Sequence, residues 1–129
     1  MSEVNVAAVL YPKPEKFEEV GKPPFFLFYC LFVLHLTTVH MIKVAALIAE
    51  VTANVQDHEP DTLLYYAIKV QNKNEIVIIE KYKNQAAVQT HLKATYFRKF
   101  SAQLPELLAK PVELRSGTLL DGSCVVSRL

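Results

Sequence analysis

The fold is decided by residues 59–114, which open with the sequence EPDTLLYYAIKVQNKNEIVIIEKYKN at positions 59–84. Two runs within it, residues 62–71 and 75–82, are dense in Leu, Ile, Val and Tyr, as β-strands are. The polar residues 71–74 between them are typical of a turn, so the two runs predict an antiparallel hairpin. The proline after Glu59 predicts that a helix ends just before the hairpin.

Residues 84–109 carry two helical patterns in succession. The first begins at Asn84–Gln85 and repeats apolar side chains at three- and four-residue spacings. The second is predicted to begin at Thr95, whose hydroxyl suits the capping position of a helix. Its inner face would consist of Phe97, Phe100, Leu104, Leu107 and Leu108. After Lys110–Pro111, residues 112–114 and 118–120 predict a last strand that is broken at Gly117.

The start of the chain supplies the first strand and the first helix. Residues 4–10 are rich in Val and Ala, which predicts a strand in the middle of a sheet. Pro14 and the glutamates after it predict the first turn of a helix, whose stripe resumes at residues 44–55. The order β-α-β-β-α-β predicts an α+β, ferredoxin-like plait. We assign residues 1–122 to this one domain and residues 123–129 to a tail.

Residues 21–43 interrupt the first helix with Pro23–Pro24 and a run of Phe and Leu. Removing them gathers the flanking apolar residues in an arc of about 140°, whereas retaining Lys43 widens the arc to about 240°. We therefore interpret residues 21–43 as an insert. Three explanations stay open: the translation of a retained intron, an ordered hydrophobic segment, and a membrane anchor. The anchor hypothesis uses residues 24–42, which lack charged side chains and approach the ~20 residues that span a bilayer.

The composition excludes several classes of function. Lysine and arginine number 14 against 13 aspartates and glutamates, so no basic field exists to bind nucleic acid. The two cysteines, Cys30 and Cys124, show no metal-ligand spacing and favour a reducing compartment. With only 3 glycines, the chain has no phosphate-binding loop, and it has no Gly-x-Ser-x-Gly nucleophile elbow.

The two ends of the sequence bear on localisation. The start, Met1–Val4, is acidic and lacks the layout of a signal peptide, so we do not expect a secreted protein. The end, Ser127–Arg128–Leu129, resembles the peroxisomal address Ser-Lys-Leu. The sequence therefore predicts a cytoplasmic or peroxisomal protein, with no membrane association unless residues 24–42 act as an anchor.

Four short blocks follow one another at fixed spacings. They are Glu59-Pro60-x-x-Leu63-x-Tyr65, Ile79-Glu80-Lys81-Tyr82-Lys83-Asn84 with Ala86-Ala87 and His91-Leu92, Tyr96-Phe97-x-x-Phe100, and Leu107-Leu108-Ala109-x-Pro111. In order and spacing the chain resembles the antibiotic biosynthesis monooxygenase domain over residues 4–114, with the insert set aside. The resemblance implies the dimeric α+β barrel superfamily, in which two plaits close their sheets against each other. Apolar residues on both faces of the hairpin independently favour a homodimer, because one layer of helices covers only one face.

The resemblance also implies an activity. Family members are oxygenases or related enzymes that act on quinols, polyketide phenols, haem or fatty-acid-derived signals, many without metal or flavin. Cofactor-free oxygenation needs a base, apolar or aromatic walls and little water. We therefore expect dioxygen as co-substrate, no other cofactor and no metal site. Haem degradation is disfavoured, because Ala8 stands where haem-degrading relatives have asparagine and no histidine occurs at residues 99–102.

Three residues are candidates for catalysis. His91 matches the family's helix histidine and suits the deprotonation of a phenol or enol, or else bonds a backbone carbonyl inside the core. Tyr82 stands where many members have tryptophan, and either lines the pocket or packs with its hydroxyl at the rim. Glu80 shares a strand face with Tyr82, and either orients His91 or forms a salt bridge on the dimer face.

Four further residues are candidates for binding the substrate. Tyr65 and Tyr66 point to opposite faces of a strand, and the motif match favours Tyr65 for the pocket. Tyr96, where the family often has histidine, would join Phe97 and Phe100 in the wall. The resulting hypothesis is a homodimeric, cofactor-independent monooxygenase of a small hydrophobic phenol, quinol or lipid-derived metabolite. The alternatives are a non-catalytic small-molecule-binding or stress-response barrel, and a domain damaged by its insert.

Overall fold

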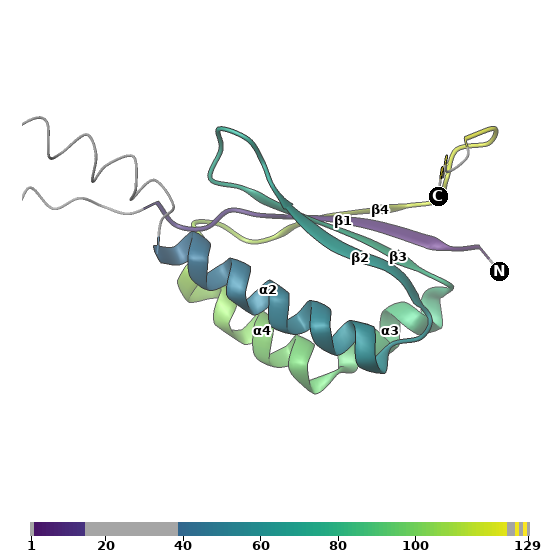
Figure 1. The fold of residues 1–129 in the computed structure, drawn as a ribbon, viewed down its shortest axis with the longest axis horizontal. Coiled ribbons are helices and arrows are strands. Elements are labelled where there is room, and N and C mark those ends of the chain that lie inside the picture. Colours follow the sequence, from purple (N-terminus) through teal and green to yellow (C-terminus); the bar gives the residue numbers. More distant parts are fainter. Residues whose placement is uncertain (1, 15–38, 124–125, 127, 129) are drawn as a thin grey trace, which may run out of the picture.

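The computed structural model describes residues 2–14, 39–123, 126 and 128 (Figure 1). In chain order its elements are β1 (Val4–Leu10), α2 (Val39–His58), β2 (Thr62–Lys69), β3 (Ile76–Tyr82), α3 (Gln85–Lys93), α4 (Thr95–Leu107) and β4 (Glu113–Gly117). The strands form an antiparallel sheet in the order β2-β3-β1-β4. The predicted ferredoxin-like α+β plait is confirmed, and β1 lies inside the sheet as the apolar run indicated.

The helices α2, α3 and α4 all lie on one side of the sheet, as Figure 1 shows. Cross-strand pairing places Ala8 beside Ile78 and Leu10 beside Ile76, and these side chains are buried under the helices. The core is completed by apolar residues of α2 and α4 and by Leu108, which follows α4. The helical residues are Met41, Val44, Ile48, Val51, Val55, Phe100 and Leu104. Burial of this apolar area is the main force that holds the helices on the sheet.

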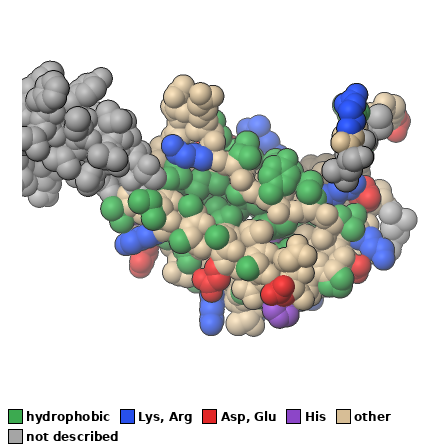
Figure 2. Space-filling view, viewed as in Figure 1, with side chains coloured by type: hydrophobic (Ala, Val, Ile, Leu, Met, Phe, Trp, Pro, Cys, Tyr) green, Lys and Arg blue, Asp and Glu red, His purple; other side chains and the backbone are tan. Residues whose placement is uncertain are grey.

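The other face of the sheet carries no helix among the described residues (Figure 1). Leu64, Tyr66 and Ile68 of β2 keep 45%, 45% and 51% of their surface exposed. Tyr66 pairs with Ile79 and Ile68 pairs with Val77, so apolar side chains continue across this face into β3. Figure 2 shows hydrophobic side chains along this upper side of the molecule. An apolar sheet face of this kind needs a cover that the described residues do not supply.

Helix α2 begins at Val39, four residues before Lys43, the predicted end of the insert. Met41 is buried and extends the stripe of Val44, Ile48, Val51 and Val55 at three- and four-residue spacings. Residues 39–43 of the predicted insert are therefore part of this helix. The rest of the insert, the predicted helix start after Pro14, and both cysteines lie outside the described residues. No described helix is both long enough and apolar enough to cross a membrane.

The hairpin turn is confirmed, and Asn72 adopts φ 61 there, a left-handed conformation that asparagine tolerates. Asn84 caps α3 by accepting the backbone N–H of Ala87 at 2.9 Å. The predicted cap at Thr95 was wrong, because the extended Ala94 separates α3 from α4 and Thr95 is already helical.

The prediction that the last strand resumes at residues 118–120, after Gly117, was also wrong. Pairing with β1 runs from Glu113, opposite Val9, to Gly117, opposite Asn5, and residues 118–120 are not part of a strand. Ladder hydrogen bonds to β1 set the extent of β4, and the pairing ends with Gly117.

Candidate functional site

A cluster of rings and carboxylates lies between the sheet and the helices α3 and α4. At its centre is His91 of α3, which is 1% exposed. The centroid of its ring lies 4.5 Å from that of Phe97, 5.5 Å from that of Tyr65 and 5.7 Å from that of Tyr82. The structure therefore brings together a titratable imidazole and aromatic walls from two strands and two helices.

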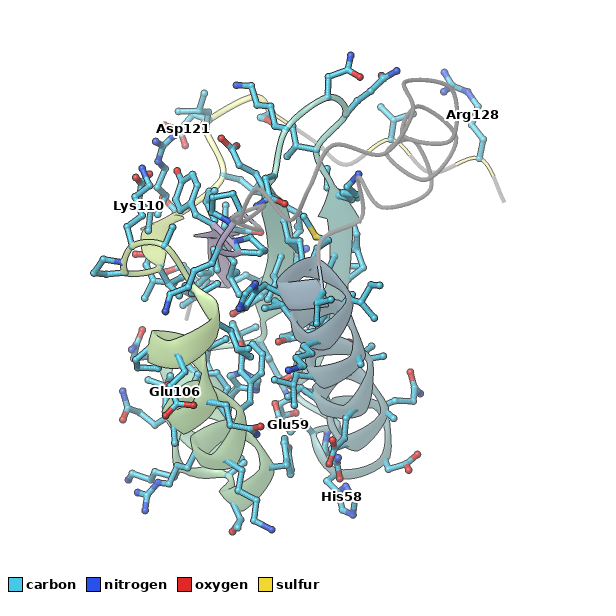
Figure 3. All side chains as sticks on the ribbon, turned by 90° about the vertical axis from the view of Figure 1, so that its left-hand side faces the viewer. His58, Glu59, Glu106, Lys110, Asp121 and Arg128 are labelled. Carbon is cyan, nitrogen blue, oxygen red and sulfur yellow. The ribbon has the colours of Figure 1, made fainter. Side chains whose placement is uncertain are left out.

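Glu59 holds His91 in place. It follows α2, whose hydrogen bonding ends with the Glu59 N–H to Val55 O bond of 3.0 Å before Pro60 stops the helix. Its carboxylate oxygens lie 2.9 and 3.1 Å from His91 Nδ1 and accept the Thr62 hydroxyl at 2.7 Å. The Tyr96 hydroxyl also donates to Glu59. Figure 3 shows Glu59 and His58 at the end of the molecule opposite Asp121 and Arg128.

These three hydrogen bonds decide the charge of Glu59. Burial opposes its ionisation, but the donors Tyr96, Thr62 and His91 together outweigh burial and lower the pKa of Glu59. The ionised carboxylate can only accept, so the proton between it and His91 belongs to Nδ1. In the neutral imidazole the lone pair is then on Nε2, which is the atom available as a base. One predicted alternative for His91 was a hydrogen bond to a backbone carbonyl. In the structure its Nδ1 bonds the Glu59 carboxylate instead.

Glu80 and Tyr82 lie on the same side of β3, as their alternation predicted, and that side faces the helices. The Tyr82 hydroxyl donates to Glu80 Oε2 at 2.7 Å. Burial raises the pKa of Glu80, and burial together with the Glu80 charge raises the pKa of Tyr82. Glu80 is 9% exposed and turned away from the open face, so the predicted dimer-face salt bridge was wrong. The orientation of His91, which Glu80 was expected to provide, comes from Glu59.

Replacing Glu80 with glutamine should raise the free energy of unfolding at pH 7. The protonated form of Glu80 contributes stability below its ordinary pKa of 4.5, and this contribution is lost as the pH rises through its raised folded pKa. Glutamine retains an acceptor for the Tyr82 hydroxyl and carries no charge to desolvate. Urea unfolding of both proteins at pH 5 and pH 8 checks this, with the larger gain expected at pH 8. A loss of stability at both values would contradict it.

Tyr65 faces the helices and Tyr66 the open side of the sheet, as the motif match favoured. Tyr65 pairs with Glu80, and its hydroxyl is buried. Burial, followed by the charges of Glu80 and Glu59, raises the pKa of Tyr65, so the hydroxyl keeps its proton. Within the part of the chain that the structure describes, neither this hydroxyl nor His91 Nε2 has a hydrogen-bond partner.

The remaining predicted wall residues take different places. Phe97 contacts the His91 ring, and Phe100 lies behind it, with 6.1 Å between the two phenyl centroids. Tyr96 faces Glu59 rather than the unpartnered side of His91, and burial and this hydrogen bond raise the pKa of Tyr96. An open hollow of about 470 Å³ borders this end of the cluster. Its lining residues are Asn54, His58, Glu59, Thr90, Lys93, Ala94, Thr95 and Tyr96.

Sequence reasoning missed Glu59 and Thr62 as site residues. Glu59 was part of the quoted motif, but we interpreted it only as the end of a helix. Glu59 and His91 are 32 residues apart in the sequence, so no local pattern predicts their contact. The feature that could have indicated Glu59 is an acidic residue next to a helix-stopping proline within the motif. Among the described residues, no three His, Cys, Asp or Glu side chains gather as a metal site.

Comparison with known proteins identifies the family. The family model described as antibiotic biosynthesis monooxygenase matches residues 32–103. Over 58 residues the chain is 33% identical to the uncharacterized protein sll1783 of Synechocystis, a match that covers 44% of this chain and 40% of that protein. The match thus spans about two fifths of that relative's length.

Solved structures share the fold. Rv0793 of Mycobacterium tuberculosis superposes with a TM-score of 0.70 at 21% identity, covering 93% of this chain and 97% of that one. PA3566 of Pseudomonas aeruginosa gives 0.68 at 16% identity, covering 93% and 96%. A structure named antibiotic biosynthesis monooxygenase gives 0.63 at 16% identity, covering 91% and 98%. Since the family model matches more than half of the sequence, the chain belongs to the antibiotic biosynthesis monooxygenase family.

Proposed function

We propose that this protein is a cofactor-independent monooxygenase that oxidises a small hydrophobic phenol, quinol or lipid-derived metabolite. One observation carries the proposal: Glu59 binds His91 Nδ1, and the buried Nε2 has no partner among the residues that the structure describes, where aromatic rings surround it. A buried imidazole with its lone pair on a free nitrogen has the properties of a general base. Family membership supports the same reaction class.

The proposed reaction on a phenol with a free para position begins at Nε2. His91 removes the hydroxyl proton, and the resulting phenolate passes one electron to dioxygen. The two radicals join through a carbon–oxygen bond at the para carbon, and the peroxide oxygen takes the proton back from His91. Loss of the para hydrogen and cleavage of the oxygen–oxygen bond then give a quinone and water. One dioxygen thus accepts four electrons, and one of its atoms enters the product.

The side chains around His91 have separate roles in this proposal. Glu59 keeps the imidazole in the tautomer with Nε2 free, and Tyr96 and Thr62 hold Glu59. The Tyr82–Glu80 pair and Phe97 form walls that exclude water, which favours transfer of charge to dioxygen. Tyr96 was expected to bind the substrate, and here we assign it to the support of Glu59.

Oxygen uptake with a panel of phenols and quinols tests the proposal. We expect consumption of one dioxygen per substrate, with one labelled atom in the product when ¹⁸O₂ is used. The alternative function is a non-catalytic binding barrel, which would hold the same compounds against the aromatic cluster without consuming oxygen. Quenching of tyrosine fluorescence by the same compounds without oxygen uptake would establish the binder and reject the enzyme.

We also propose that the open sheet face is covered by a second copy of this chain. The face carries the exposed Leu64, Tyr66 and Ile68, and the superfamily to which the fold belongs pairs its sheets in this way. Sedimentation at micromolar concentration should give twice the chain mass of 14.6 kDa. Ile68→Lys would place a charge in the buried interface and should shift the protein to monomers. Ala53→Lys on the exposed side of α2 is the control, and a wild-type monomer would reject the dimer.

A further inference from the structure

The hydrogen bond between Tyr96 and Glu59 joins a phenol to a charged carboxylate at the edge of the hollow. The Tyr96 hydroxyl donates to Glu59 Oε1, and Thr62 and His91 donate to the same carboxylate. Burial opposes ionisation of Glu59, but these donors outweigh it and lower the pKa, so the carboxylate is charged at neutral pH. Tyr96 and Glu59 both line the open hollow of about 470 Å³, so small molecules in solution reach this pair.

A phenol that donates to a base is easy to oxidise by one electron. Loss of an electron from the ring makes the hydroxyl proton strongly acidic, and a base that already binds this proton takes it as the electron leaves. Glu59 Oε1 is such a base for Tyr96. After the transfer, Glu59 Oε2 still accepts His91 Nδ1 at 3.1 Å and the Thr62 hydroxyl at 2.7 Å, so the neutral acid keeps its position.

Three other tyrosines in the described part of the chain each lack one part of this arrangement. Tyr82 also donates to a carboxylate, that of Glu80, but Tyr82 is 1% exposed and does not line the hollow. The Tyr65 hydroxyl has no partner among the described residues. Tyr11 lies under Lys110 Nζ, 3.8 Å from its ring centroid, and a cation in that place opposes the removal of an electron from the ring.

We propose that Tyr96 is a redox-active tyrosine that reduces one-electron oxidants, such as organic phenoxyl or peroxyl radicals, at the hollow. In one step the oxidant takes an electron from the Tyr96 ring, and the hydroxyl proton passes to Glu59 Oε1. The products are the anion of the oxidant, a neutral Tyr96 radical and the carboxylic acid of Glu59. One electron from a soluble reductant such as ascorbate then restores Tyr96, whose oxygen takes the proton back from Glu59.

This activity goes beyond the proposed oxygenation and does not need His91 to act as a base. The two are connected in space, because the proposed oxygenation makes a substrate radical beside His91, and Glu59 contacts both His91 and Tyr96. Tyr96 lies where this cluster meets the hollow, so it is placed to reduce a radical that escapes before it combines with oxygen.

Stopped-flow mixing of the protein with hexachloroiridate(IV) tests the proposal without any substrate. This ion is a one-electron oxidant whose colour fades when it is reduced. The chain contains no tryptophan, so a ring radical trapped by rapid freezing and seen by electron paramagnetic resonance belongs to tyrosine. We expect a fast phase of reduction that slows in D₂O, because a proton moves with the electron. We expect Tyr96→Phe to lose both this phase and the radical signal.

Two further variants separate the proton acceptor from the ring. Glu59→Gln keeps an oxygen that accepts the Tyr96 hydroxyl but takes no proton, so it should slow the fast phase by about 10²-fold. Tyr66→Phe is the matched control, because Tyr66 is 45% exposed on the sheet face opposite the helices, and it should leave the phase unchanged.

The inference is overturned if Tyr96→Phe reduces the oxidant as fast as the wild type, or if Tyr66→Phe is the variant that loses the radical. An unchanged rate in D₂O would also overturn it, and this measurement needs no variant to fold. Oxygen uptake with phenols is scored separately. A Tyr96 radical in a protein that consumes no oxygen upholds this inference and rejects the monooxygenase, whereas oxygen uptake without the Tyr96 phase does the reverse.

Discussion

Replacing His91 with alanine should lower the turnover of an accepted phenol or quinol by about 10²-fold or more. The imidazole presents a buried nitrogen, Nε2, that has no hydrogen-bond partner among the described residues, whereas Glu59 and Glu80 both accept hydroxyl donors. Without it, the substrate hydroxyl keeps its proton and transfers no electron readily to dioxygen. Steady-state oxygen uptake at saturating substrate measures the effect, and wild-type turnover in the variant would remove His91 from the mechanism.

Two controls separate chemistry from folding in this experiment. His58→Ala removes an exposed histidine whose Nδ1 contacts a carbonyl of its own helix, and it should leave turnover unchanged. His91→Gln retains polar contact with Glu59 and is less disruptive than alanine, but it offers no basic nitrogen. We expect His91→Gln to be as inactive as His91→Ala while giving a near-wild-type far-ultraviolet circular dichroism spectrum.

Replacing Glu59 with leucine should lower the free energy of unfolding by about 3–5 kcal/mol. The carboxylate is 5% exposed and accepts hydrogen bonds from His91, Tyr96 and Thr62, which would all lose their acceptor. Glu106→Leu on the exposed side of α4 is the matched control, and it should change stability by less than about 0.5 kcal/mol. Guanidinium unfolding of both variants measures the difference, and equal small effects would show that the buried network contributes little.

The same carboxylate should give stability a defined dependence on pH. Because the folded pKa of Glu59 is lowered, its contribution is fully present above the ordinary value of 4.5 and is lost as the pH falls through the folded pKa. Glu59→Gln removes this titration, so the difference in stability between wild type and variant should shrink on acidification. A difference that stays constant from pH 7 down to the acid transition would mean that Glu59 is not ionised in the fold.

Much of the fold follows from local pattern. Apolar residues at consecutive positions in 62–69 and 76–82 predict strands with apolar groups on both faces, and the polar turn between them sets the hairpin. The cap at Thr95 and the strand at residues 118–120 were predicted wrongly because local preference competes with packing against neighbouring elements. The pairing of β4 with β1 and the extended Ala94 decide where those elements begin and end.

The sequence by itself determined the plait, the open apolar face, and the placing of Tyr65 and His91 on the inner side. The plait, the open face and the place of His91 depend on periodicity, which repeats within a few residues, whereas the choice of Tyr65 over Tyr66 came from the motif match. Only the tertiary structure decided that Glu59, 32 residues before His91, orients the imidazole, and that Tyr96, 37 residues after Glu59, supports the carboxylate. Hydrogen bonds between side chains on different elements depend on how those elements pack, and no local pattern encodes that distance.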